Sequence, residues 1–155
     1  MALRRLVLGL GNDLLGDDSI GLRVVELLRE RPSLAGFKFE TADCAGLALL
    51  DLLAGYDEAF VVDCVQGGDE PVGEVRRLHF EELANPLTLS SHYAGLPDVL
   101  ALARRLGLSL PEVAVLAVSV RDPYRIGPDL SPALRRALPV VVEQVEAALL
   151  EGACA

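Results

Sequence analysis

The sequence has no tryptophan, one methionine, two histidines and three cysteines among its 155 residues. No two cysteines form a C-x-x-C pair, which argues against a disulfide framework or a cysteine-rich zinc site and favours reduced thiols in the cytoplasm. No apolar run approaches the ~20 uninterrupted residues of a membrane helix. The apolar stretch behind Arg4 and Arg5 is short and interrupted by two glycines, so it indicates a first strand rather than a signal peptide.

Basic residues are also scarce, since 14 Lys and Arg stand against 23 Asp and Glu, a net charge of −9. Without a basic surface to neutralise phosphates, neither nucleic acid nor an anionic membrane is expected as a partner. Arg76 and Arg77 fall in a predicted strand and are expected on its solvated face, with contact to an acidic partner as the alternative. The length predicts a single domain over residues 1–155, and we expect a monomer.

Strand patterns and helical patterns alternate along the chain. Strands are expected at residues 3–11, 37–42, 58–65, 73–80 and 111–120, and helices at 18–32, 45–56, 95–107 and 133–152. This order predicts an α/β fold, a three-layer α/β/α sandwich with a mostly parallel, mixed five-stranded sheet. The hairpin-like step from 58–65 to 73–80 would supply the antiparallel strand. In such sheets ligands bind at the carboxyl ends of the strands, where the strand order reverses.

The loop after the first predicted strand reads G-L-G-N-D-L-L-G-D-D over residues 9–18. It does not match a nucleotide site, because Leu14 replaces the third glycine of G-x-G-x-x-G and no G-K-S/T phosphate loop is present. The acidic pair Asp17 and Asp18 would also repel a phosphate at the helix start. Capping of the following helix explains one of these aspartates and leaves the other free to point elsewhere.

Two further polar residues are expected at the same edge of the sheet. Asp63 ends a strongly apolar strand, and His92 precedes a helix whose positive end favours the neutral imidazole that a metal requires. Asp18, Asp63 and His92 would form a mixed oxygen and nitrogen set suited to zinc or nickel. Each residue also has an ordinary explanation, as a helix cap, a solvated strand end or a surface histidine. Their spacings of 45 and 29 residues match no local metal motif, so the residues alone leave both interpretations open.

Three segments together resemble a known family. They are V-L-G-L-G-N-D-L-L-G-D-D-S-I-G-L-R-V-V-E-L-L, V-V-D-C-V and S-S-H-Y-A-G-L-P-D-V-L-A-L-A-R-R-L-G. In this order they resemble the hydrogenase maturation proteases, endopeptidases that process the large subunit of nickel–iron hydrogenases. The resemblance implies that Asp18, Asp63 and His92 bind the metal. Asp18 stands where relatives often have glutamate, and Cys44 stands where they have a hydroxyl residue.

The resemblance further implies the reaction. The enzyme would remove the C-terminal extension of a hydrogenase large-subunit precursor after nickel insertion, with the nickel supplied by that substrate as the recognition element. Zinc or cadmium would be able to occupy the site in vitro. The chemistry stays open between metal activation of water or carbonyl and an aspartic-type carboxylate base, and no further catalytic or substrate-binding residue is assigned. A metal-sensing checkpoint without hydrolysis and another hydrolase on the same fold are the alternatives.

Overall fold

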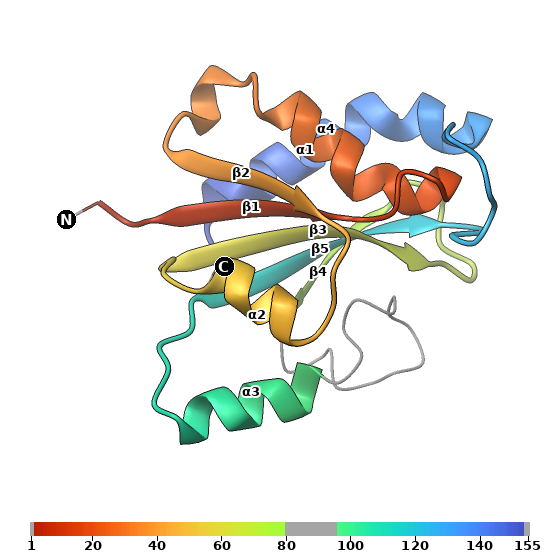
Figure 1. Ribbon diagram of the computed structural model, residues 1–155. Coiled ribbons are helices and arrows are strands. Elements are labelled where there is room, and N and C mark those ends of the chain that lie inside the picture. Colours follow the sequence, from red (N-terminus) through yellow and green to blue (C-terminus); the bar gives the residue numbers. More distant parts are fainter. Residues whose placement is uncertain (1, 80–95, 154–155) are drawn as a thin grey trace.

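The structure, a computed structural model, describes residues 2–79 and 96–153. Its elements are β1 (Arg5–Leu10), α1 (Ile20–Leu28), β2 (Phe37–Ala42), α2 (Leu47–Leu53), β3 (Glu58–Gln66), β4 (Val75–His79), α3 (Leu96–Arg105), β5 (Glu112–Val120) and α4 (Pro132–Glu151) (Figure 1). Two short 3-10 turns, η1 (Gly16–Ser19) and η2 (Pro32–Leu34), flank α1. The order of strands and helices is the one predicted from the sequence. Among the described helices, none has the length and apolar character that a membrane crossing requires.

The strands form one mixed sheet in the order β2-β1-β3-β5-β4. All neighbouring pairs are parallel except β4 with β5, so the predicted mostly parallel, five-stranded sheet is confirmed. The strand expected at residues 73–80 is the antiparallel one, as predicted, but the hairpin pairing with 58–65 is wrong, because β5 lies between β3 and β4. The buried strand β5 pairs along the whole of β3, whereas the partly exposed β4 lies at the edge of the sheet, where one face and one side meet solvent.

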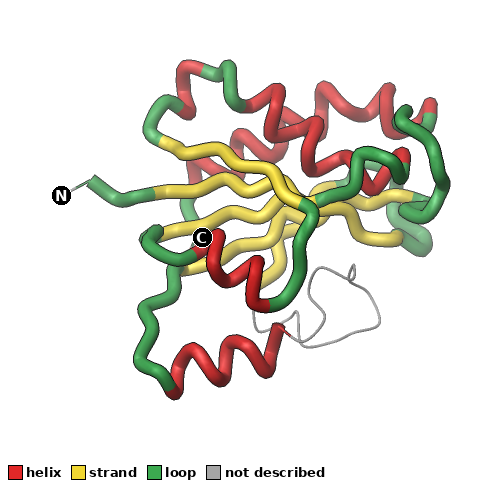
Figure 2. Tube along the Cα trace, viewed as in Figure 1, coloured by secondary structure: helices red, strands yellow, loops and turns green. Residues whose placement is uncertain are grey.

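Helices cover both faces of this sheet, which confirms the predicted α/β/α arrangement. Helices α1 and α4 lie on one face, and α2 and α3 lie on the other (Figures 1 and 2). Each face has its own apolar core. Under α1 and α4 the core includes Val24, Val142, Phe60 and Leu116, and on the opposite face it includes Leu49, Leu53, Leu8 and Val61. Strand residues from β1, β3 and β5 are buried in these two cores: Val7, Leu8, Val61, Val62, Val115, Leu116 and Val118.

The strand order reverses between β1 and β3. The pairing of these two strands stops at Gly9 and Val62, but β3 continues to Gln66 along β5. Past Val62, the side of β3 that β1 has left therefore faces the loop that leads from β1 into α1. This is the crevice in which parallel sheets bind their ligands.

Glycines allow α1 to pack with its backbone directly on the strands at this crevice. A Cβ atom at Gly21, in the first turn of α1, would lie 2.3 Å from the carbonyl oxygen of Val62 and 2.5 Å from that of Leu10. A Cβ at Gly9 would lie 2.5 Å from the carbonyl oxygen of Gly21. No side chain fits at these contacts, so they fix the distance between the start of α1 and the end of the β1–β3 pair.

The two neighbouring arginines of β4 have separate environments. Arg77 donates hydrogen bonds to the carbonyl oxygens of Gly152 at 2.6 Å and Ala148 at 3.0 Å, at the end of α4. It thereby satisfies carbonyls that the helix leaves open and places a positive charge at the negative end of the helix dipole. The expectation that Arg77 lies on a solvated face is wrong, whereas Arg76 is exposed.

Replacement of Gly21 by alanine tests the close packing of α1. Helix propensity alone would make Gly21→Ala more stable by about 1 kcal/mol. Because the new methyl group would clash with two backbone carbonyls, we expect a loss of about 1–3 kcal/mol in the free energy of unfolding, measured by urea denaturation. Gly36→Ala is the matched control, since its nearest obstacle is the flexible end of Arg5 at 3.3 Å. A Gly21→Ala protein as stable as the wild type would contradict this packing.

Candidate functional site

The adjacent aspartates of η1 have different partners. Asp17 is buried and accepts two hydrogen bonds from Ser131, one from its backbone N–H at 2.6 Å and one from its hydroxyl at 2.7 Å. Ser131 is the N-cap residue of α4, so Asp17 joins η1 to the start of that helix. The expected side-chain cap on the helix that follows Asp17 and Asp18 is not formed. Asp17 is therefore a structural residue.

Asp18 points the other way, toward β3. Its Oδ2 accepts a hydrogen bond from the backbone N–H of Asn12 at 2.9 Å. Its Oδ1 accepts a hydrogen bond from the thiol of Cys64, with a sulfur–oxygen distance of 3.1 Å. The carboxylate is thus held between the loop that leaves β1 and the open side of β3, at the crevice where the strand order reverses.

The loop that precedes Asp18 is held in place by the loop between β5 and α4. The N–H of Gly127 donates to the carbonyl of Leu14 at 2.8 Å, and the N–H of Gly16 donates to the carbonyl of Gly127 at 2.7 Å. These bonds form an isolated parallel bridge between Leu15 and Gly127. Together with the Asp17–Ser131 contact, they fix η1 from both sides and so fix the position of Asp18.

Asp63 lies inside β3, three residues before its end, and not at a solvated strand terminus as one interpretation of the sequence suggested. Its side chain is fully buried. Its Oδ1 accepts a hydrogen bond from the backbone N–H of Cys64 at 2.8 Å, on the part of β3 that β1 no longer covers. Burying a carboxylate costs free energy unless hydrogen bonds or a cation compensate for the lost water. Asp63 therefore differs from an ordinary aspartate at the protein surface.

Asp18, Asp63 and Cys64 form one buried cluster. One donor atom from each lies within 4.8 Å of the others. Donor-to-metal distances of about 2.0–2.3 Å put two ligands of the same ion at most ~4.6 Å apart, so the spacing is close to that of a divalent metal site. Two carboxylate oxygens suit a divalent ion, and nickel and zinc both accept such ligands. The donor set therefore fits the metal that the sequence resemblance implies.

Cys64 is the member of the cluster that sequence reasoning did not assign. Side-chain alternation places it on the α1 and α4 face, away from Asp63, and it belongs to the apolar core there. Asp18 reaches Cys64 only because η1 folds over the open side of β3. Burial raises the pKa of the Cys64 thiol far above its ordinary value, and the carboxylates of Asp63 and Asp18 raise it further. The thiol is thus a hydrogen-bond donor, and a poor nucleophile.

The third residue predicted as a metal ligand, His92, lies outside the described residues, as do Ser90 and Ser91. The structure thus brings together two of the three predicted residues, Asp18 and Asp63. The loop at Cys44, where the sequence departs from its relatives, lies between β2 and α2 at the same carboxyl edge of the sheet. Burial, and after it the charge of Asp43, raises the pKa of the Cys44 thiol, so this residue is also expected to be protonated.

The chain is similar to known proteins over most of its length. Residues 22–148 match the sequence model of the HycI family, described as hydrogenase maturation protease. The hydrogenase 2 maturation protease of Escherichia coli (strain K12) is 33% identical over 153 residues, covering 97% of this chain and 93% of that protein. The hydrogenase expression/formation protein HoxM of Azotobacter vinelandii is 33% identical over 162 residues, covering 95% of this chain and 77% of that protein.

The structural comparison extends over the same part of the chain. The solved structure of the hydrogenase maturating endopeptidase HybD from E. coli superposes with a TM-score of 0.74 at 32% sequence identity. The superposition covers 96% of this chain and 93% of that one. The extent of the sequence matches and the common fold lead to one assignment: the chain belongs to the hydrogenase maturation protease family.

Proposed function

We propose that this maturation protease removes the C-terminal extension of a nickel–iron hydrogenase large-subunit precursor, and that it acts only after nickel has been inserted. The observation that carries this proposal is the buried pair Asp18 and Asp63 in the crevice at the carboxyl ends of the strands. In a parallel sheet this edge is the place where ligands bind. We further propose that it works as a cytoplasmic monomer.

In this proposal the nickel belongs to the substrate, and Asp18, Asp63 and His92 contact it when the precursor binds. Two carboxylates within 4.8 Å of each other in a buried cluster repel, and a divalent cation removes that repulsion. A precursor without nickel would bring no cation to relieve this repulsion. The cluster therefore discriminates by charge, since the same contacts are favourable with the metal and unfavourable without it. Three protein ligands also leave coordination positions for donors of the substrate. Zinc or cadmium would occupy the same positions in vitro.

Hydrolysis of the peptide bond requires a water molecule to lose a proton and the leaving amine to gain one. The protonated Cys64 makes a thiolate mechanism unfavourable, so water is the proposed nucleophile. Asp18 and Asp63 are the described carboxylates at the site that would accept its proton, while the substrate's nickel is the group that would polarise the carbonyl or the water. The two routes share the same residues.

The neighbouring aspartates provide a matched test of this assignment. Asp18→Asn and Asp63→Asn each remove a charge that would face nickel, so we expect both to abolish processing of nickel-loaded precursor. Asp17→Asn weakens the link to Ser131 and should lower the free energy of unfolding by about 1–3 kcal/mol while processing continues below the melting temperature. Intact mass of the large subunit reports processing, and thermal unfolding reports stability.

The outcomes of this test separate the alternatives. Normal processing by Asp63→Asn would refute the proposed metal contacts. If the wild-type protein binds the nickel-loaded precursor but releases no C-terminal fragment, the protein is a metal-sensing checkpoint and not a peptidase. Processing of nickel-free precursor at the same rate would show that nickel is not the recognition element.

A second pair of variants tests which residue is the third metal contact. Cys64 packs into the apolar core under α1 and α4 and already donates to Asp18, so Cys64→Ala should keep processing within about tenfold of wild type. His92→Ala should abolish processing while the melting temperature stays within a few degrees of wild type. Rates of fragment release and circular dichroism melting curves measure both effects. The reverse result, with Cys64→Ala inactive and His92→Ala active, would make Cys64 the ligand.

A further inference from the structure

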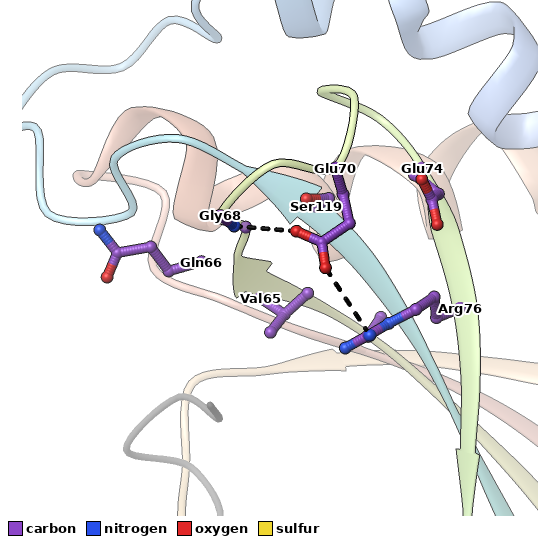
Figure 3. Close-up of a pocket in the computed structure, with 9 residues that line it drawn as sticks. Val65, Gln66, Gly68, Glu70, Glu74, Arg76 and Ser119 are labelled. Atoms are coloured by element: carbon purple, nitrogen blue, oxygen red, sulfur yellow. Dashed lines mark hydrogen bonds and ion pairs between the residues drawn. The ribbon is translucent and has the colours of Figure 1, made fainter. Parts of the chain in front are cut away.

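A cavity lies beside the Asp18 and Asp63 cluster, on the sheet face that α2 and α3 cover elsewhere. Its volume is about 170 Å3, and it is lined by the ends of β3 and β5, the loop of residues 67–74 and Arg76 of β4 (Figure 3). We call it the Arg76 cavity. The polar residues that line this cavity take no part in the contacts described for Asp18, Asp63 and Cys64. The role of these polar residues is therefore a separate question.

Strand register connects this cavity to the cluster. Asp63 of β3 and Arg76 of β4 are both register partners of Ala117 in β5, so the three residues form one row across the sheet with their side chains on one face. Arg76 is two strand spacings from Asp63 in this row, about 10 Å. Val65, in the cavity wall, is two residues beyond Asp63 along β3, about 7 Å away. A chain that has its reacting bond at Asp63 and runs toward Arg76 or Val65 would reach the cavity within two or three residues.

The cavity holds polar groups with unused hydrogen-bonding capacity. Ser119 is only 5% exposed and lines the cavity, yet no hydrogen bond within residues 2–79 and 96–153 involves its hydroxyl. In the same part of the chain, the guanidinium of Arg76 has one polar contact, with Glu70 Oε1 at 3.9 Å, which is too long for a hydrogen bond. Glu70 is oriented by the N–H of Gly68, which donates to its Oε2 at 2.9 Å (Figure 3). The hydroxyl of Ser119 and the guanidinium of Arg76 thus line the cavity with donors that a ligand would be able to use.

The charges around the cavity narrow the chemistry of that ligand. Hydrogen bonds from its own backbone and from Gly68 lower the pKa of Glu70, which therefore carries a negative charge, and Glu74 lies in the same wall. These carboxylates would repel an anion, whereas Arg76 would repel a cation. A neutral group with both an acceptor and a donor satisfies all of them, and a peptide amide is such a group.

We propose that the Arg76 cavity binds a main-chain amide of the precursor, two or three residues from the bond that is cleaved. Arg76 and Ser119 donate to the carbonyl oxygen, and Glu70 accepts from the N–H. This inference rests on the proposed peptidase function and adds a substrate-positioning subsite to it. Because every peptide bond offers the same donor and acceptor, the subsite aligns the chain without selecting its side chains.

Adjacent arginines supply the test. Arg76→Met keeps the length of the side chain but removes its donors, and Ser119→Ala removes the hydroxyl. With nickel-loaded precursor, we expect Arg76→Met to raise KM about tenfold and Ser119→Ala about threefold, with kcat within twofold of wild type. Arg77→Met is the matched control: it breaks the contacts to Gly152 and Ala148, so it should lower the melting temperature but leave KM within twofold.

A second readout does not depend on activity. In a titration of the 15N-labelled protein with N-methylacetamide, we expect the amide signals of Gly67, Gly68 and Ser119 to shift in the wild type and in Arg77→Met, and not in Arg76→Met. An unchanged KM in Arg76→Met, or a loss in kcat instead, would overturn the inference, as would identical titrations of wild type and Arg76→Met. Absence of cleavage by the wild type with a normal titration would reject the proposed function and leave an amide-binding cavity.

Discussion

The close contact between the first turn of α1 and the ends of β1 and β3 determines the rest of the site. Because Gly21 has no side chain, the helix backbone lies on the carbonyl groups of Val62 and Leu10. Asp18 precedes this turn and Asp63 follows Val62, so one backbone contact sets the separation of the two carboxylates. A methyl group at Gly21 would displace the helix and so move Asp18 relative to β3. The position of a metal ligand tolerates errors of only fractions of an ångström.

The same contact explains how the protein holds an unfavourable pair of charges. Carboxylates that converge in a buried place favour unfolding or protonation, unless the surrounding structure leaves them no other arrangement. Here the arrangement is imposed by groups that take no part in the proposed chemistry: the Asp17–Ser131 contact, the bridge at Gly127 and the core under α1 and α4. The stability of the fold thus holds the two carboxylates where the proposed nickel contact requires them.

Sequence reasoning found the fold because alternating apolar patterns report which residues are buried, and burial determines the layers. It placed β4 wrongly, because adjacency along the chain says nothing about β5, which inserts later between β3 and β4. It found Asp18 and Asp63 through their position at strand ends and through the family motif. Without the family motif, the residues alone could not choose between Asp17 and Asp18, since the choice depends on Ser131, more than a hundred residues away. Cys64 was missed as a neighbour of Asp18, because alternation turns it to the opposite face.

Three pairs of adjacent residues divide structural contacts and the proposed functional positions in the same way. Asp17 binds the start of α4 and Asp18 faces the crevice, and Cys64 packs in the core beside Asp63. Arg77 binds the end of α4, while Arg76 lines the cavity. In a strand this follows from the pleat, which sends neighbouring side chains to opposite faces. One member of each pair is held by the core or by a helix end. The backbone that carries the other member is therefore rigid. A site built on such positions keeps its geometry before the substrate binds.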